Sequence, residues 1–228
     1  MPRGAVAAAL TLLLALAPDP STGARAPIRR EDAFVGYSER TIPASGSHYG
    51  ERRPEDGASG RPTTLVLSTS AGEIEIGLRR DWAPELTKAI ETAVGVGGAC
   101  SSSTSSSCSF YRSEAAPDPG AIDNYGGPGP PYALLQGSFE GLGSDHAKEE
   151  GPEALRGYVC LIGNGPDFFI ATRSHQEWGK AHTVFGEVVS MKLVDDITET
   201  YPVHHETWGQ TNVTVLDDRI PFTARIVS

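Results

Sequence analysis

The pattern of apolar positions divides the chain into an irregular first part and a folded second part. From about residue 27 to residue 62, Arg, Glu, Gly, Ser and Pro are frequent and apolar residues show no periodicity. Such a segment cannot bury enough apolar surface to offset its ordering entropy. We therefore expect a flexible linker over residues 27–63 and one folded domain over residues 64–228.

Alternating apolar and polar positions in the second part predict many short strands. The first two, at residues 65–67 and 74–78, are joined by a turn at Ser70-Ala71-Gly72. The later strand-like segments are residues 110–111, 132–136, 158–162, 168–172, 183–189, 212–216 and 222–227. A long Gly- and Pro-rich stretch over residues 115–131 is expected to be a surface loop.

Two segments have helical spacing instead. Apolar residues recur every three or four positions over residues 86–94, with Asp81 as a candidate cap, Pro84 in the first turn and Gly97-Gly98 at the end. Residues 192–200 form the second expected helix. Many short strands, with one helix early and one late, favour a mainly β fold, a closed antiparallel barrel capped by two helices.

Composition and charge narrow the class of protein. A chain of 228 residues with 39% hydrophobic residues can bury one sizeable core, and a second large domain would leave both undersized. The formal net charge of -10 argues against nucleic-acid binding, which needs clustered Lys and Arg. We expect one acidic domain that acts as a monomer.

Residues 1–26 have the features of a secretory signal peptide. Arg3 gives a basic start, residues 5–17 are apolar, and small residues at Ala24 and Ala26 suit cleavage. The apolar run is shorter than the about 20 residues that a spanning helix needs, so no stable membrane span is expected. The predicted location is the secretory pathway or the extracellular space, with a signal-anchored membrane protein or an organelle lumen as alternatives.

The three cysteines suit an oxidising compartment. Cys100 and Cys108 flank a Ser-rich run and could close a small loop by a disulfide, which leaves Cys160 in an apolar segment as a buried, unreactive thiol. Asn212-Val213-Thr214 is a glycosylation sequon, with Asn212 as the acceptor.

Two other groups of polar residues are not expected to form a catalytic or metal site. His204-His205 beside Glu206 could suggest a metal site, but no second ligand pair has suitable spacing, so we expect a solvated loop and no metal. Glu73 and Glu75 alternate with apolar residues and are expected on the solvated face of their strand.

Several segments, taken in order, resemble motifs of the cyclophilin family of peptidyl-prolyl cis-trans isomerases. They are Thr69-Ser70-Ala71-Gly72-Glu73-Ile74, Asp81-Trp82-Ala83-Pro84, Phe110-Tyr111-Arg112, Leu134-Leu135-Gln136-Gly137, Gly165-Pro166 with Phe168-Phe169-Ile170, and His182-Thr183-Val184-Phe185-Gly186-Glu187-Val188. The last of these is the most specific. The resemblance covers about residues 64 to 227 and implies a closed eight-stranded barrel.

The resemblance also implies a site and an activity that needs no cofactor. It assigns the catalytic role to Arg112 and an orienting role to Gln136, with Phe169 as the floor for a substrate proline ring. His182 corresponds to a histidine on the pocket rim, and Trp178 to the aromatic rim residue after a one-residue slip. A guanidinium that donates to the proline nitrogen favours the unconjugated, twisted amide, which lowers a barrier of about 18–20 kcal/mol.

The sequence departs from the family's motifs around this site. Tyr132 and Ala133 stand where the family has a pocket phenylalanine, and Asp167 stands where it has a glutamine. A carboxylate at residue 167 could pair with Arg112 and compete with the substrate. Two functions therefore remain open: an isomerase acting on proline-containing peptides or proteins, or a catalytically weak or inactive module that binds such peptides.

Overall fold

The computed structural model describes residues 63–102, 108–116, 120 and 132–228. The expected signal peptide and linker, and most of the Gly/Pro-rich segment, lie outside these residues. The strands are β1 (Thr64–Thr69), β2 (Gly72–Leu78), β3 (Ser109–Glu114), β4 (Leu134–Ser138), β5 (Tyr158–Leu161), β6 (Asp167–Ala171), β7 (Thr183–Val188), β8 (Val203–Trp208) and β9 (Thr211–Val227). The helices are α1 (Pro84–Gly95), the short 3-10 helix η1 (Gln176–Trp178) and α2 (Lys192–Thr200).

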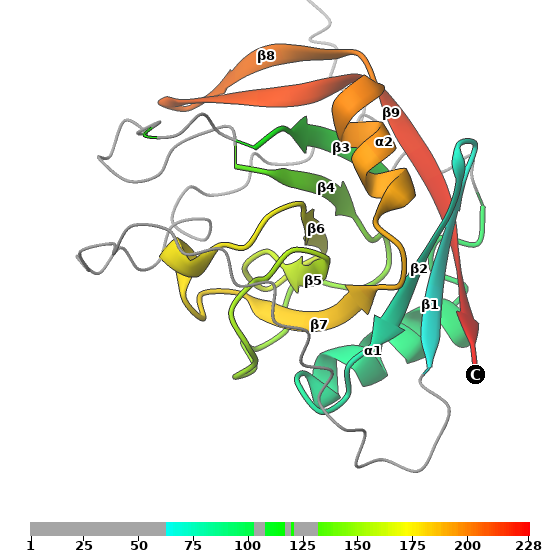
Figure 1. The fold of residues 1–228 in the computed structure, drawn as a ribbon. Helices are drawn as coiled ribbons and strands as arrows, with labels where there is room; N and C mark the ends of the chain where they lie inside the picture. The colour runs from blue at the N-terminus through cyan, green and yellow to red at the C-terminus, as the bar shows by residue number, and fades with distance from the viewer. Residues whose placement is uncertain (1–62, 103–107, 117–119, 121–131) are drawn as a thin grey trace, which may run out of the picture.

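Eight of these strands close into an antiparallel barrel. Their order is β1-β2-β7-β5-β6-β4-β3-β9, and a further pairing of β1 with β9 completes the circle. In Figure 1, α1 and α2 lie at different ends of this barrel, and β8 extends outside it beside β9. The expected fold class, a mainly β closed barrel capped by two helices, is confirmed.

Alternation along the strands fills the barrel with apolar side chains. One face of each of the eight barrel strands faces a single large cluster, which includes Leu65, Ile76, Phe110, Leu135, Phe168, Phe185 and Phe222. Side chains from α1 and α2, such as Ile90 and Ile197, join the same cluster. The opposite face of β4, β5, β6 and β7 contributes to a second cluster around Phe169, on which the candidate site is built.

Two motif glycines are required by packing. A Cβ atom on Gly186 would lie 2.5 Å from Ile76 Cγ2, and one on Gly137 would lie 3.0 Å from both the Phe110 ring and the Ser109 carbonyl. No larger residue fits at either position without moving a core side chain or the backbone. These contacts explain why the Gln-Gly and Phe-Gly motifs end in glycine.

The start of α1 differs from the sequence expectation. Asp81 was expected to cap this helix, but its carboxylate accepts hydrogen bonds from Arg79 (Nη2–Oδ2 2.7 Å). The cap residue is Ala83, whose side chain offers no acceptor. Glu149 takes over the role from a distant loop, because its carboxylate accepts the backbone N–H groups of Glu85 (3.0 Å) and Leu86 (2.8 Å).

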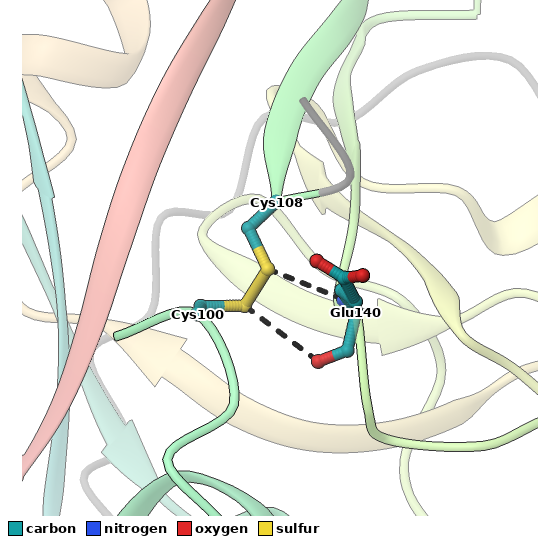
Figure 2. Close-up of a disulfide and its surroundings, with 3 residues drawn as sticks. All are labelled: Cys100, Cys108 and Glu140. Carbon is teal, nitrogen blue, oxygen red and sulfur yellow. Dashed lines mark hydrogen bonds between the residues drawn. A yellow bond between two sulfur atoms is a disulfide. The ribbon is translucent and has the colours of Figure 1, made fainter. Parts of the chain in front are cut away.

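Cys100 and Cys108 are joined by a disulfide, with Cα atoms 5.6 Å apart. The bond links the segment after α1 to the start of β3, and the backbone N–H of Glu140 donates to Cys108 Sγ (3.3 Å) beside it (Figure 2). Cys160 is a free thiol with no exposed surface, and burial raises the pKa of this thiol well above its ordinary value. This agrees with the expected unreactive core cysteine.

A further correction concerns His204, His205 and Glu206, which were expected to lie in a solvated loop. The segment 203–208 is strand β8, which pairs with β9 in a hairpin from Val203↔Leu216 to Trp208↔Thr211. The residues are solvent-exposed as expected, apart from the half-buried Trp208. Glu73 and Glu75 lie on an exposed face, also as expected. Among the described residues, no helix has the length and apolar character needed to cross a bilayer.

Candidate functional site

A β-bulge in β3 places Tyr111 and Arg112 on the same side of the sheet. Phe110 pairs with Gly137 on β4, whereas Arg112 pairs with the adjacent Gln136, so Tyr111 is the extra residue. Phe110 packs in the barrel core. Without the bulge, Arg112 would face the core as Phe110 does, because successive side chains alternate. The irregularity therefore turns the guanidinium toward the outer face.

Strand register then aligns three predicted site residues. Arg112 on β3 lies directly opposite Gln136 on β4, and Gln136 lies directly opposite Phe169 on β6. Directly opposite residues in antiparallel strands have Cβ atoms about 4.5–5.5 Å apart and share a face. The fold thus brings Arg112, Gln136 and Phe169 into one row across three neighbouring strands.

The Arg112 guanidinium is held by two side chains. Its Nε–H donates to Glu114 Oε1 (2.9 Å), with Nη2 at 2.8 Å from the same oxygen, and Nη1 donates to Gln136 Oε1 (3.0 Å). Gln136 Nε2 donates in turn to the Tyr111 hydroxyl. These contacts use three of the five N–H groups of the guanidinium. The described residues leave the other two N–H groups available to a bound peptide.

Glu114 is a buried carboxylate that sequence reasoning missed. Its side chain has no exposed surface. Besides Arg112 it accepts hydrogen bonds from the backbone N–H groups of Tyr132 (2.5 Å) and Thr214 (3.2 Å). It therefore compensates the charge of Arg112 and ties β3 to β9 and to the segment before β4. The signal was available, since Glu114 follows Arg112 by two positions and so shares its face.

Aromatic rings surround Phe169 at the other end of the row. Phe169 is 1% exposed and meets the rings of Trp178 (5.6 Å between centroids) and His182 (5.1 Å) edge-on. Trp178 stacks on His175 with centroids 3.7 Å apart. The structure thus places both expected rim residues, Trp178 and His182, beside the expected floor.

His175 was not singled out from the sequence. It is fully buried, and its Nδ1 lies 2.9 Å from Glu177 Oε1 while its Nε2 lies 3.3 Å from the Ala133 carbonyl oxygen. Burial is the largest single effect and raises the pKa of Glu177, but the hydrogen bonds from His175 and from its own backbone, together with the nearby charges of His175 and Arg173, hold that pKa below its ordinary value. Through its stacked ring, His175 fixes the orientation of Trp178.

Tyr132 joins the two ends of the site. Its ring centre lies 5.6 Å from Arg112 Cζ and 6.1 Å from the Trp178 ring. The departure noted from the sequence therefore places an aromatic ring that carries a hydroxyl between Arg112 and Trp178. Ala133, next in the chain, is buried and has a positive φ of 53°.

Burial determines the charge of His182. Desolvation is the main cause that lowers the pKa of this imidazole to about 4; the Leu161 carbonyl opposes it, and nearby His175 and Lys148 make smaller lowering contributions. The Nδ1–H group donates to that carbonyl (3.3 Å), so Nε2 carries no proton at neutral pH. His182 presents a neutral, weakly polar edge to Phe169.

The ion pair that Asp167 could have formed with Arg112 is not present in the described part of the chain. Asp167 lies opposite Ser138 on β4, two positions along β6 from Phe169. Arg112 pairs instead with Glu114 on its own strand. The carboxylate that competes for the guanidinium therefore comes from β3, and the register explains why Asp167 does not reach it.

Comparison with known proteins finds similar proteins by structure and not by sequence. No family model matches the sequence, and no curated protein matches it. A solved cyclophilin-type peptidyl-prolyl cis-trans isomerase of Cryptosporidium parvum is similar with a TM-score of 0.47 and 13% identity, over 74% of this chain and 99% of that chain. A second structure of that isomerase, in the presence of the dipeptide Ala-Pro, gives a TM-score of 0.48 and 14% identity over 72% and 99%.

The barrel is cyclophilin-like in fold. Eight strands close an antiparallel barrel with two helices, as the motifs predicted. Similarity at this level of identity concerns the fold alone. The assignment of roles to Arg112, Gln136 and Phe169 stays a prediction.

The cyclophilin-like barrel also carries a residue near the site that no motif indicated. Trp208, at the end of β8, has its ring centre 5.1 Å from Arg112 Cζ and 6.4 Å from the Tyr111 ring. It comes from the hairpin outside the barrel, so its position could not be read from the chain before the pairing of β8 with β9 was known. The predicted glycosylation acceptor, Asn212, is exposed on the same hairpin.

Proposed function

We propose that the chain binds proline-containing segments of polypeptides at this face and accelerates their cis/trans isomerisation. One observation carries the proposal: Arg112, Gln136 and Phe169 form a continuous row on β3, β4 and β6. A cation, a polar amide and an apolar ring in this order match the parts of a prolyl peptide, namely its nitrogen, a neighbouring carbonyl and its ring.

The chemistry requires only positioned donors. Rotation about the imide bond breaks the conjugation of the nitrogen lone pair, at a barrier of about 18–20 kcal/mol. A donor aimed at that nitrogen interacts with it more strongly in the twisted state than in the planar state, and such differential binding accelerates the reaction. The two remaining N–H groups of Arg112 can supply this donor, while Gln136 and Glu114 hold the guanidinium in place.

The proline ring is proposed to pack on Phe169. Because Phe169 is 1% exposed, a ring reaches it only when a group that covers it moves. Trp178 is half-buried and lies edge-on to Phe169, so a rotation of its side chain would open the apolar floor. We expect peptide binding to be accompanied by such a movement.

A second function, peptide binding without useful catalysis, is favoured by Glu114. Its carboxylate takes two of the guanidinium nitrogens and compensates the positive charge in a buried setting. A compensated cation stabilises developing charge less than a free one does. The isomerase proposal therefore predicts activity that depends on Arg112 despite the ion pair.

Exchange NMR on an Ala-Pro-containing peptide separates the two functions. The rate of cis/trans exchange is measured without protein, with wild type, and with Arg112→Ala, while binding is followed from peptide shifts. The isomerase proposal predicts acceleration by wild type and a fall on the order of 100-fold in kcat/KM for Arg112→Ala. Binding without any acceleration by wild type would assign the chain to the second function.

Phe169→Ala and Glu75→Ala complete the experiment. Phe169→Ala removes the apolar ring on which the proline is proposed to pack, so this variant is expected to bind the peptide more weakly than wild type. Glu75 is exposed on β2, away from the row, and its replacement is expected to leave both rate and affinity unchanged. Peptide binding that survives loss of both Arg112 and Phe169 would contradict the proposed site altogether.

We also propose that the protein acts in the secretory pathway or outside the cell. The disulfide between Cys100 and Cys108 supports this, because disulfides persist in oxidising compartments. Expression of the full chain with a C-terminal tag in eukaryotic cells tests the location. A shortened, secreted product is expected, and retention of the full-length chain in the cytosol would contradict the proposal.

A further inference from the structure

The β8–β9 hairpin carries a connected row of polar side chains that ends at the candidate site. His204, Glu206 and Trp208 alternate along β8 and share one face. His204 Nδ1 lies 2.7 Å from Asp217 Oδ1 on β9, and its Nε2 lies 3.3 Å from Glu206 Oε1. Trp208 Nε1–H then donates to Glu206 Oε2 (2.7 Å).

This row fixes the indole of Trp208 beside Arg112. The single polar group of the indole is used by Glu206, so only its apolar faces are available for other contacts. The ring centre lies 5.1 Å from Arg112 Cζ and 6.4 Å from the Tyr111 ring, whose hydroxyl meets Gln136. Trp208 is half-buried, so part of its surface is open to solvent.

The Trp208 side of the site is separate from the Phe169 side. Within the described residues, no ring contact joins Trp208 to Phe169 or to Trp178. Arg112 is close to both groups, since its Cζ lies 5.6 Å from the Tyr132 ring and 5.1 Å from the Trp208 ring. In the sheet, β3 lies between β4 on the Phe169 side and β9, which pairs with β8 and its Trp208. A proline on Phe169 with its nitrogen at Arg112 would therefore have a neighbouring residue close to Trp208, because consecutive Cα atoms are about 3.8 Å apart.

Charges around these rings indicate which side chain fits. Arg219 Cζ lies 5.2 Å from the Tyr111 ring and Arg112 lies against Trp208, so a basic side chain would be repelled. Glu206 accepts the indole N–H, so an acidic side chain would meet a like charge beside the two arginines. A large neutral side chain meets neither penalty and buries apolar surface against both rings.

Resting on the proposed function, we infer that Trp208 and Tyr111 form a second subsite, which selects an aromatic or large apolar residue directly beside the substrate proline. Trp208 is a specificity-determining residue in this scheme, and the hairpin that holds it is part of the peptide-binding surface.

Two series of short peptides test the inference, one varied before the proline and one after it, each with Phe, Leu, Ala, Glu or Lys. Dissociation constants are measured by NMR titration. For one of the two positions, wild type is expected to bind the Phe peptide about five- to tenfold more tightly than the Ala peptide. The Glu and Lys peptides are expected to bind no more tightly than the Ala peptide.

Variants locate the preference. Trp208→Ala is expected to reduce the Phe-to-Ala ratio to below about twofold, and Trp208→Phe, which keeps a ring, should retain most of it. His205→Ala is the matched control, because His205 lies on the other face of the same strand and should keep the full ratio. Amide spectra of each variant establish that the hairpin still pairs.

The outcomes distinguish the two proposals. A wild type that binds the Ala-Pro peptide in a manner dependent on Phe169, yet shows no preference in either series, overturns the subsite and leaves the proposed function intact. A preference that survives Trp208→Ala with a folded hairpin also overturns it. Failure of every proline peptide to bind overturns the proposed function and this inference together.

Discussion

The Arg112 guanidinium and the Glu114 carboxylate form an ion pair within β3, with Nη2 and Oε1 2.8 Å apart and 12% and 0% of the two side chains exposed. A buried pair of this kind has lost most of its hydration, so each partner depends on the other. The same carboxylate holds two backbone N–H groups of other segments. The pair therefore has two roles. Glu114 connects β3 to neighbouring segments, and it partly neutralises the Arg112 cation that is proposed for catalysis.

Glu114→Gln is predicted to lower the free energy of unfolding by about 3 kcal/mol, because it leaves the Arg112 charge without its partner. Urea denaturation measures the change. In an Arg112→Met background the same substitution should cost at least about 1 kcal/mol less, since the charge is then absent. Equal costs in both backgrounds would show that the ion pair contributes nothing of its own.

His182 predicts a pH dependence of stability. Burial lowers its folded-state pKa to about 4 from an ordinary 6.5, so the unfolded chain takes up a proton in a range where the folded protein does not. The contribution of neutral His182 is complete above pH 6.5 and is lost as pH falls from about 6.5 to about 4. The loss amounts to up to about 3 kcal/mol.

Comparison of wild type with His182→Gln isolates this contribution from the other titrating groups. The free energy of unfolding is measured from pH 7.5 to pH 4. The difference between the two proteins should shrink as the pH falls, since glutamine has no proton to take up. A difference that stays constant over this range would contradict a neutral, buried His182.

Gly186 and Gly95 form a matched pair of glycine substitutions. A Cβ at residue 186 would meet Ile76 Cγ2 at 2.5 Å, whereas one at residue 95 in α1 would meet nothing within 4 Å. Gly186→Ala is predicted to destabilise the fold by about 1–3 kcal/mol through overpacking. Gly95→Ala should stabilise it by about 0.5 kcal/mol through the lower entropy of the unfolded chain. Thermal denaturation checks both signs, and a stabilised Gly186→Ala variant would refute the packing account.

The disulfide between Cys100 and Cys108 spans eight positions in sequence. Closing a loop of this size in the unfolded chain contributes about 2.5 kcal/mol of stability. Wild type is predicted to lose this amount under reducing conditions, and the double variant Cys100→Ala/Cys108→Ala should not respond to reductant. Cys160→Ala, which keeps the bond, should respond as wild type does. A reductant response in the double variant would mean that the effect has another source.

The sequence predicted most of the barrel because its strands have strong local signals. Leu65, Leu67, Ile74 and Ile76 alternate clearly, and they lie in β1 and β2 as expected. The second helix was expected over residues 192–200 and spans Lys192–Thr200. Strand β8 was missed because its six residues are exposed or half-buried and carry no apolar alternation, so only its pairing with β9 defines it.

The site was predictable in part for a related reason. Arg112, Gln136 and Phe169 belong to ordered motifs, and the register that aligns them follows from strands that the sequence indicates. Trp208 could not be placed with the same reasoning, because its role depends on the hairpin. Glu114 was overlooked, although its spacing of two positions from Arg112 places both side chains on one face. The contact that Asp167 could have made with Arg112 is not formed, because position in a motif does not fix register across strands.

The most direct test of the central claim is to locate a bound proline. Saturating an isotope-labelled protein with an Ala-Pro-containing peptide and recording intermolecular NOEs, or solving the structure of the complex, gives the position of the proline ring. The account predicts that the ring packs on Phe169 and that its nitrogen lies within hydrogen-bond distance of Arg112. A proline bound elsewhere on the barrel, with Phe169 still covered, would contradict it.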